Sequence, residues 1–474
     1  MSDYLSRISC FREISVSLKE NSPRRIVSEI KFDGDVFRLI FSYNRRVEIP
    51  DENLAGMISL LPVVNFALFT DKIIADFPSD SVDRKFISEM IRINNIETFI
   101  NSICRRRYEF FRKDFLPDDG DISLENAVGR TEVEYTGEGK ALEKLREKTS
   151  ANGMGVMLSG GKESLLTFGM LREMGMDPWA LFYNESGAHW NPAIPVNRYI
   201  RSTERDLKVW TNTDRLYRRM LRSMKILDQA AVSAVADTYP IQLFVFPVYL
   251  MAALPLMLTQ GIGRVFMGNE FDDPREMVPY MGISHYYGIY DQSEEFIMRF
   301  NSYLSEKGIA LKLLSALYPV SAAKVEETLI SRYHDLYVMQ RSCHSSRISG
   351  GEIIPCGRCS KCIGVISLIL AAGGNPEEIN YRKSDIQYAE KRLLTDRIRL
   401  DPDEVKYIIS RMHNRDPGDA GHIAGFHILP GEKELYSHLN AELRDGFVGI
   451  LKNYVHGVYE LKDREWVQSP KYSF

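Results

Sequence analysis

A glycine pair between an apolar run and a helix-like stretch constrains the fold of this chain most. Met154–Leu158 reads as a buried strand, and Ser159-Gly160-Gly161-Lys162-Glu163-Ser164 follows it directly. A strand that breaks at glycines and restarts as a helix points several backbone N–H groups into one concavity, which suits phosphate. Lys162 adds a positive charge, and the two serine hydroxyls can donate hydrogen bonds to phosphate oxygens. The stretch therefore predicts a phosphate-binding turn; the alternative is an ordinary Gly-Gly connection.

The hexapeptide does not have the Walker spacing, which places four residues between the first glycine and Gly-Lys-Ser/Thr. It resembles the SGGxDS loop of the PP-loop ATP pyrophosphatases, which cleave ATP between the α- and β-phosphates and activate a substrate oxygen as an adenylate. The resemblance implies that the phosphates are held by Ser159, Gly160, Gly161, Lys162 and Ser164. Glu163 stands where that family usually has Asp, and it is expected near Mg²⁺ or the nucleotide.

Strand-like and helix-like stretches alternate from Gly153 onward. Strands are expected at Met154–Leu158, Trp179–Tyr183, Leu207–Trp210 and Arg264–Met267, and helices at Lys162–Met174, Asp214–Met224 and within Ile241–Thr259. Repeated βα units predict an α/β fold with a parallel sheet and helices on both faces. Ligands of such sheets bind at the carboxyl ends of the strands. The residues expected there are Asn184-Glu185, Thr211-Asn212-Thr213 and Gly268-Asn269-Glu270, of which Asn184 and Asn269 are predicted to contact the nucleotide.

The regions on either side do not show this alternation of strands and helices. Residues 1–145 predict an α+β region, with strands at Glu13–Leu18 and Asp35–Phe41 and helical spacing from Leu54 through Phe115. The polar stretch Thr136–Lys140 is typical of a linker. Residues 146–376 form the expected PP-loop domain, and residues 377–474, charged and helical in pattern, form a small mostly helical region.

Composition limits the function classes. The 474 residues predict two or three domains, and 44% hydrophobic with 26% charged residues is ordinary for a soluble globular protein. The net charge of −4 argues against a broad nucleic-acid surface, although Arg105-Arg106-Arg107 leaves a local basic patch open. Met1–Leu18 shows no signal-peptide pattern. The longest apolar stretch, Leu243–Leu258, contains two prolines and predicts a buried helix, so we expect a cytoplasmic protein without a membrane span.

Four of the six cysteines fall close together. Cys343 is followed by Cys356, Cys359 and Cys362. Four thiolates suffice for a tetrahedral structural Zn²⁺ site. An iron–sulfur cluster also takes four cysteines and stays open as the alternative, as do unbound thiols, whereas a cytosolic chain disfavours disulfides. Cys10 and Cys104 are expected to be small buried apolar residues.

A PP-loop followed by such a cluster resembles the 7-cyano-7-deazaguanine synthases over roughly Gly153–Leu370. Those enzymes are much shorter, and their cysteines are spaced more tightly. Over its whole length the chain is more similar to the ATP-dependent UDP-N-acetylmuramoyl-L-alanyl-L-glutamate epimerases. The segments that carry this likeness are Ser159–Ser164, Phe266–Glu270, Ser284-His285-Tyr286 with Gln292–Phe296, and Ser342-Cys343 with Cys356–Cys362.

This resemblance implies adenylation of a small-molecule carboxylate. Adenylation neutralises the carboxylate and makes the neighbouring carbon acidic enough for a side-chain base. We expect Lys162, Glu270 and His285 in catalysis, with His285 as the proton-transfer group and His344 as the second choice. Asp272-Asp273 can bind Mg²⁺, but two acidic residues before a proline are more typical of a solvated turn. ATP, Mg²⁺ and Zn²⁺ are the expected ligands.

Three other functions remain open. An adenylated carboxylate can instead react with ammonia, as in an amide- or nitrile-forming synthase. A tRNA-modifying PP-loop enzyme would need a basic face and usually a nucleophilic cysteine in the catalytic domain; the net charge and the lack of cysteine between Cys104 and Cys343 argue against it. A nucleotide-binding module without activity is the fourth class. The oligomeric state is left open.

Overall fold

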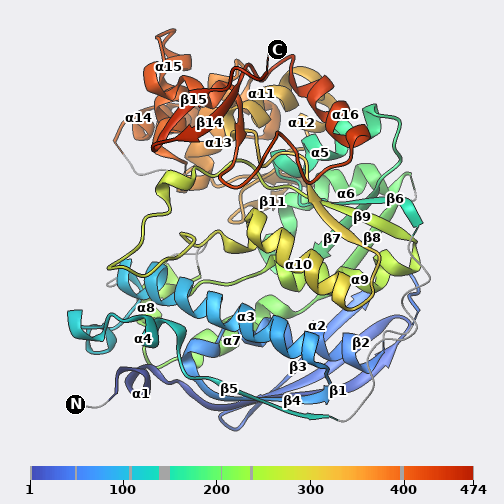
Figure 1. Ribbon diagram of the computed structural model, residues 1–474, viewed down its shortest axis with the longest axis vertical. Helices are drawn as coiled ribbons and strands as arrows, with labels where there is room; N and C mark the ends of the chain where they lie inside the picture. Colours follow the sequence, from blue (N-terminus) through green and yellow to red (C-terminus); the bar gives the residue numbers. More distant parts are fainter. Residues whose placement is uncertain are drawn as a thin grey trace.

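One large sheet organises the molecule (Figure 1). The computed structural model describes residues 3–48, 51–105, 109–137, 150–203, 205–234, 239–395 and 400–472. The sheet has ten strands in the order β10-β9-β6-β7-β8-β3-β2-β1-β4-β5. Six neighbouring pairs are parallel and three are antiparallel, so the expected α/β class is confirmed.

The parallel half of the sheet carries the expected βα units. Its strands are β6 (Ser150–Met157), β7 (Trp179–Asn184), β8 (Asp206–Thr211), β9 (Ile262–Met267) and β10 (Lys312–Ser315). The helices between them include α5 (Lys162–Glu173), α6 (Ile194–Arg201), α7 (Thr213–Ser223), α8 (Gln229–Ala234), α9 (Phe246–Thr259) and α10 (Glu294–Glu306). The four strands and three helices expected in this half are confirmed; β10 was not expected.

Both faces of this half are covered, as the apolar strands predict. Side chains on successive strand residues alternate between two hydrophobic cores. Val156, Ala180 and Phe266 pack with α5 in one core, whereas Met157, Leu181 and Val265 pack with α9 in the other. Helix α9 is almost entirely buried, as expected for the apolar stretch Leu243–Leu258. Among the described residues, no helix combines the length and apolar character needed to cross a membrane.

The N-terminal stretch continues the same sheet. Its strands are β1 (Phe11–Ser22), β2 (Arg25–Phe32), β3 (Asp35–Tyr43), β4 (Thr70–Pro78) and β5 (Glu132–Gly137). β3 pairs antiparallel with β8, and the Asn212 side chain seals the junction by accepting from the Ile40 amide and donating to the Arg38 carbonyl, both at 2.9 Å. The N-terminal and central stretches therefore share one sheet and one core.

The predicted helical spacing from Leu54 through Phe115 is only partly correct. Helices α2 (Glu52–Val64) and α3 (Ser81–Glu97), extended by a π-helical segment at Thr98–Arg105, lie over the N-terminal strands (Figure 1). Between them β4 is a strand, because its apolar residues alternate and it pairs in parallel with both β1 and β5. Of the proposed linker Thr136–Lys140, the first two residues end β5 and the rest lie outside the described residues.

The C-terminal region contains a small sheet that the charged, helical pattern did not indicate. The later helices are α11 (Ala322–Arg332), α12 (His334–Tyr337), α13 (Ser360–Ala371), α14 (Lys383–Leu393), α15 (Pro402–Met412) and α16 (Ala441–Leu451). The sheet consists of β13 (Phe426–Ile428), β14 (Val458–Lys462) and β15 (Glu465–Gln468). Asp463 and Arg464 connect β14 to β15 with positive φ angles of 48° and 68°, the geometry of a tight hairpin turn. A hairpin of β11 (Arg347–Ser349) and β12 (Glu352–Ile354) and two short helices, α1 (Tyr4–Ile8) and α4 (Leu124–Val128), complete the chain.

Candidate functional site

The predicted phosphate-binding turn lies at the carboxyl end of β6 and begins α5. Gly161 is the N-cap residue of α5, and no side chain caps the helix there. Ser164 donates from its hydroxyl to the Gly161 carbonyl at 3.0 Å, and the Gly161 amide donates to the Ser159 hydroxyl at 3.3 Å. The two serines therefore fix the shape of the turn, and the positive end of α5 begins at it.

Two glycines allow close backbone packing around the turn. Gly160 has φ +86°, and a Cβ placed on it would lie 2.2 Å from the carbonyl oxygen of Pro192. A Cβ on Gly268 would lie 2.8 Å from the Ser164 amide nitrogen. A side chain at either position would push the turn away from its neighbours. The Gly268-Asn269-Glu270 segment after β9 is thereby held directly against the start of α5.

Lys162 lies at the centre of the site, with its side chain 8% exposed. Its ammonium group forms ion pairs with Glu163 and, at 2.7 Å, with Glu270. Burial opposes its charge, but the two carboxylates outweigh burial and raise the pKa of Lys162. Burial also opposes ionisation of Glu163, but Lys162 lowers its pKa, whereas burial raises the pKa of Glu270 well above its usual range. Lys162, Glu163 and Glu270 are thus brought together as predicted.

Further carboxyl groups surround this lysine, of which sequence reasoning named only Asp272. Burial raises the pKa of Asp272, Glu326 and Glu404 to about 7 each, and Lys162 is among the charges that act on all three. Glu326 is fully buried; one carboxylate oxygen accepts from Gln340 at 3.0 Å, and the other has no hydrogen-bond partner within the described part of the chain. The site therefore holds more acidic groups than one ammonium can neutralise.

The predicted asparagines occupy different positions. Asn269 is buried beside Glu270, and its amide nitrogen donates to the Gln292 carbonyl at 2.8 Å, while its amide oxygen has no partner among the described residues. Asn184 ends β7, and its side-chain oxygen accepts from the Ser186 amide at 2.9 Å. Both lie at the carboxyl edge of the sheet as expected. Asn269 has a free acceptor for a ligand, whereas Asn184 stabilises a turn.

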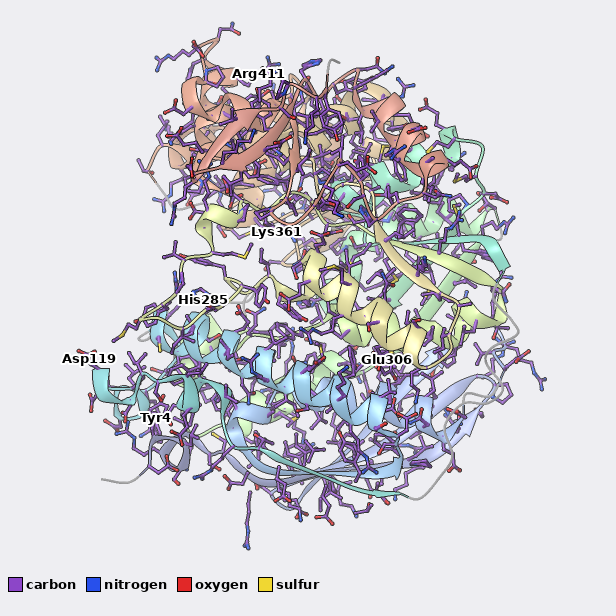
Figure 2. All side chains as sticks on the ribbon, viewed as in Figure 1. Tyr4, Asp119, His285, Glu306, Lys361 and Arg411 are labelled. Carbon is purple, nitrogen blue, oxygen red and sulfur yellow. The ribbon has the colours of Figure 1, made fainter. Side chains whose placement is uncertain are left out.

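His285 lies beside α3 of the N-terminal stretch (Figure 2). Glu97 at the end of α3 accepts from the amides of Tyr286 and Gly288, both at 2.6 Å, and so anchors this segment. The Tyr287 amide donates to Nδ1 of His285, and the Arg105 guanidinium lies 3.1 Å from Nε2. Burial and Arg105 lower the pKa of His285 to about 4. The role of His285 as a base stays a prediction, and Arg106 and Arg107 of the basic patch lie outside the described residues.

The four predicted cysteines converge. The sulfur atoms of Cys343, Cys356, Cys359 and Cys362 all lie within 4.8 Å of one another, and none is in a disulfide. The amides of Cys356 and Cys362 donate to the sulfurs of Cys343 and Cys359 at 3.3 and 3.4 Å. Such N–H···S bonds orient and stabilise thiolate ligands. This set can hold a metal ion such as zinc, where it would link α13 to the hairpin β11–β12. Cys104 is buried as expected; Cys10 is partly buried, and burial raises the pKa of its thiol to about 11.

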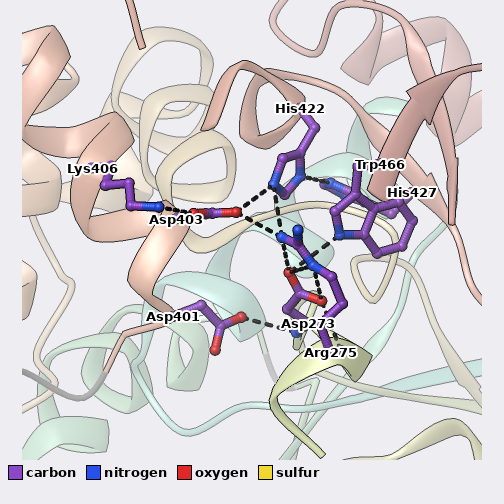
Figure 3. A network of polar contacts seen from close by, with 8 residues as sticks. All are labelled: Asp273, Arg275, Asp401, Asp403, Lys406, His422, His427 and Trp466. Atoms are coloured by element: carbon purple, nitrogen blue, oxygen red, sulfur yellow. Dashed lines mark hydrogen bonds and ion pairs between the residues drawn. The ribbon is translucent and has the colours of Figure 1, made fainter. Parts of the chain in front are cut away.

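The expectation of a solvated turn at Asp272-Asp273 is wrong (Figure 3). Asp273 is 5% exposed, and Arg275 lies between it and Asp403 at 2.6 Å from each. Trp466 and His422 complete the network around the guanidinium. Asp273, Asp403 and His422 could together hold a metal ion, but the Arg275 guanidinium already supplies the positive charge there. The network therefore fastens the C-terminal region to the segment that carries Glu270.

Replacing Arg275 by methionine is expected to lower the free energy of unfolding by roughly 3 kcal/mol, because the buried Asp273 carboxylate loses its charge partner. Urea unfolding followed by circular dichroism measures this change. The matched control is Arg411→Met, since Arg411 is exposed on α15 (Figure 2). Equal stability of the two variants would contradict a clamping role for Arg275.

Comparisons with known proteins give no family for this chain. No family model matches the sequence, and neither a curated protein nor a solved structure matches it.

Proposed function

We propose that the chain binds ATP at Ser159–Ser164 and uses it to adenylate a carboxylate, releasing pyrophosphate. The observation that carries the proposal is a buried lysine at the uncapped, positive end of α5, on a glycine turn at the carboxyl edge of a mostly parallel sheet. The resemblance to PP-loop ATP pyrophosphatases supports the type of cleavage. Epimerisation of the terminal glutamate of UDP-N-acetylmuramoyl-L-alanyl-L-glutamate is the first outcome to test.

Binding of ATP requires Lys162 to change partners. In the structure its ammonium pairs with Glu163 and Glu270, so a phosphate oxygen would replace one carboxylate. The first amides of α5 and the hydroxyl of Ser159 would then donate to the remaining phosphate oxygens. Lys162 would thereby stabilise the charge that builds up on the pyrophosphate leaving group.

The carboxyl groups fit a divalent cation. Glu163, Glu270 and the unpartnered oxygens of Glu326 and Asn269 are the hard oxygen ligands that Mg²⁺ prefers. Bound there, Mg²⁺ would supply charge neutralisation for the triphosphate. Without a cation, the acidic groups around Lys162 would repel ATP.

ATP binding should therefore depend on Mg²⁺, and a carboxylate substrate should drive ATP–pyrophosphate exchange. Equilibrium dialysis with labelled ATP, with Mg²⁺ or with EDTA, measures the first. Exchange with UDP-N-acetylmuramoyl-L-alanyl-L-glutamate, and hydroxylamine trapping over a panel of other carboxylates, measures the second. Equal ATP binding in EDTA would contradict the cation site, and ATP binding without exchange on any carboxylate would contradict adenylation. ATP–pyrophosphate exchange together with formation of D-glutamate in the product identifies an epimerase. Exchange together with incorporation of ammonia into the product identifies an amide- or nitrile-forming synthase.

A further inference from the structure

A second polar cluster lies beside the phosphate-binding turn, at the end of the neighbouring strand β7. Glu185 is 6% exposed, and its carboxylate lies 2.7 Å from Nδ1 of His189. With Nδ1–H donating to Glu185, the lone pair of Nε2 is left available, and within the described residues nothing hydrogen-bonds to Nε2. A carboxylate that fixes the tautomer of a histidine and leaves the other nitrogen available is the arrangement of a general base.

The backbone is strained where it places this pair. Ser186 and Gly187 both have positive φ, at 67° and 76°, directly after β7. For serine this conformation is unfavourable, and such strain persists only where the surroundings enforce it. The two residues reverse the chain so that His189, in the short 3-10 helix Gly187–Ala193, folds back over Glu185.

Charged and aromatic groups surround His189. Asp214 at the start of α7 accepts from the Tyr239 hydroxyl at 2.6 Å and pairs with Arg218 at 2.9 Å. The rings of Tyr239 and His344 lie 5.9 and 4.9 Å from that of His189. Burial and Arg218 oppose protonation, but Glu185 and Asp214 outweigh them and raise the pKa of His189.

The pair is in contact with the phosphate-binding turn through its own segment. Pro192, three residues after His189, packs its carbonyl against Gly160, as described above. The side chain of Asn191 donates to the Ser346 carbonyl at 3.0 Å, and the Arg341 amide donates to the Gly160 carbonyl at 2.8 Å. The turn, the His189 segment and the segment around His344 thus meet at one edge of the sheet, whereas His285 lies beside α3.

We infer that His189, oriented by Glu185, is the general base that acts on the substrate carrying the activated carboxyl group. The inference rests on the proposed adenylation. Once the carboxyl is an adenylate, one of two steps follows. Either a proton leaves the carbon beside it, or an amine forms a C–N bond to the carboxyl carbon and loses a proton while the bond from that carbon to the AMP oxygen breaks and AMP leaves. In both cases the proton moves to Nε2 of neutral His189, the electrons of the broken C–H or N–H bond stay on carbon or nitrogen, and Glu185 stabilises the imidazolium until the proton is released to solvent or returned.

The test separates adenylation from proton transfer. His189→Gln should lower overall turnover about 100-fold or more and leave ATP–pyrophosphate exchange near the wild-type rate. The matched control is His413→Gln, at an exposed position directly after α15, which should keep turnover. His285→Gln tests the competing assignment of the base. For the carbon case, wash-in of deuterium from D₂O into the substrate measures the proton step directly.

A pH profile distinguishes a base from a structural histidine. A base works in its neutral form, so turnover should rise with pH as His189 loses its proton, with a midpoint above the ordinary value of about 6.5. Glu185→Gln removes the main group that raises this pKa, so the rising limb should move to lower pH and turnover on the plateau should fall. Histidine-labelled NMR titration of wild type and Glu185→Gln gives the same shift without any substrate.

The outcomes are distinct. Two results together support the inference. His189→Gln should lose turnover but keep ATP–pyrophosphate exchange, and the rising limb of the pH profile should move to lower pH in Glu185→Gln. Retained turnover in His189→Gln, or loss in His285→Gln alone, overturns it while adenylation stands. Loss of exchange and turnover together in a folded His189→Gln assigns the residue to ATP binding and also overturns it. Absence of exchange in the wild-type protein with every carboxylate overturns the adenylation proposal, and the inference falls with it.

Discussion

Replacing Lys162 by methionine is expected to weaken ATP binding roughly 100-fold, or by about 2.8 kcal/mol, since the charge-assisted hydrogen bond from its ammonium group to phosphate is lost. Pyrophosphate exchange should fall at least as far, because the same ammonium would stabilise the leaving group. Titration calorimetry and the exchange assay measure the two effects.

This substitution needs two companions, because Lys162 also neutralises buried carboxylates. In Lys162→Met/Glu270→Gln one carboxylate is removed together with the ammonium, so the fold should recover while ATP binding stays weak. Lys312→Met, at an exposed position on the edge strand β10, controls for a general effect of losing a lysine. ATP binding by folded Lys162→Met at wild-type affinity would remove the main support for the proposed nucleotide site.

We expect a metal ion held by the four-cysteine cluster to stabilise the fold, so that its removal lowers the free energy of unfolding by several kcal/mol. That corresponds to a drop in Tm of roughly 10 °C for a chain of this size. Cys356→Ser and treatment with a strong chelator should have the same effect, because both leave the remaining thiolates without the metal ion that they would share. Thermal unfolding followed by differential scanning calorimetry measures it.

The control for the metal experiment is Cys10→Ser, which lies outside the cluster and should keep both metal content and Tm. Elemental analysis identifies the ion, and visible absorption distinguishes an iron–sulfur cluster from colourless zinc. Purified protein without metal, or an unchanged Tm in Cys356→Ser, would contradict a structural metal site.

Sequence patterns over a few neighbouring residues predicted the elements whose conformation depends on interactions between those same residues. The turn at Ser159–Ser164, α5 and the central strands follow from glycines, apolar runs and helical spacing within a few residues of one another. The convergence of Cys356, Cys359 and Cys362 follows from their spacing in one turn. These were correct because the interactions that fix them act between neighbours in the chain.

Other features depend on partners far away in sequence. β4 was missed because its strand conformation depends on pairing with β1 and β5, and β3 joins β8 across about 170 residues, as Asn212 and Ile40 show. Glu326 and Glu404 belong to helices α11 and α15, and only packing brings their carboxyl groups into the field of Lys162. No spacing rule in one sequence could place them there.

The two candidate histidines show the same contrast between what neighbouring residues indicate and what distant partners decide. His285 was selected from its polar, aromatic neighbours in sequence, yet Glu97 anchors that segment beside α3. His189 had no motif, although a Glu four residues before it was a local sign of the pair. Only the positive φ angles at Ser186-Gly187 and the contact between Gly160 and Pro192 place that pair beside the turn at Ser159–Ser164.

The sequence by itself determined an α/β chain with a glycine turn between β6 and α5 and a four-cysteine cluster, because these features depend on short-range spacing and on glycine at fixed positions. The tertiary structure decided that the N-terminal strands extend the same sheet and that Asp273 is buried against Arg275 and not exposed to solvent. It also decided that the His189 segment packs against the turn at Ser159–Ser164, whereas Glu97 anchors the His285 segment beside α3. The physical reason is that strand pairing, burial of charge and the closing of long loops depend on which distant residues pack together, and one sequence does not state those pairings.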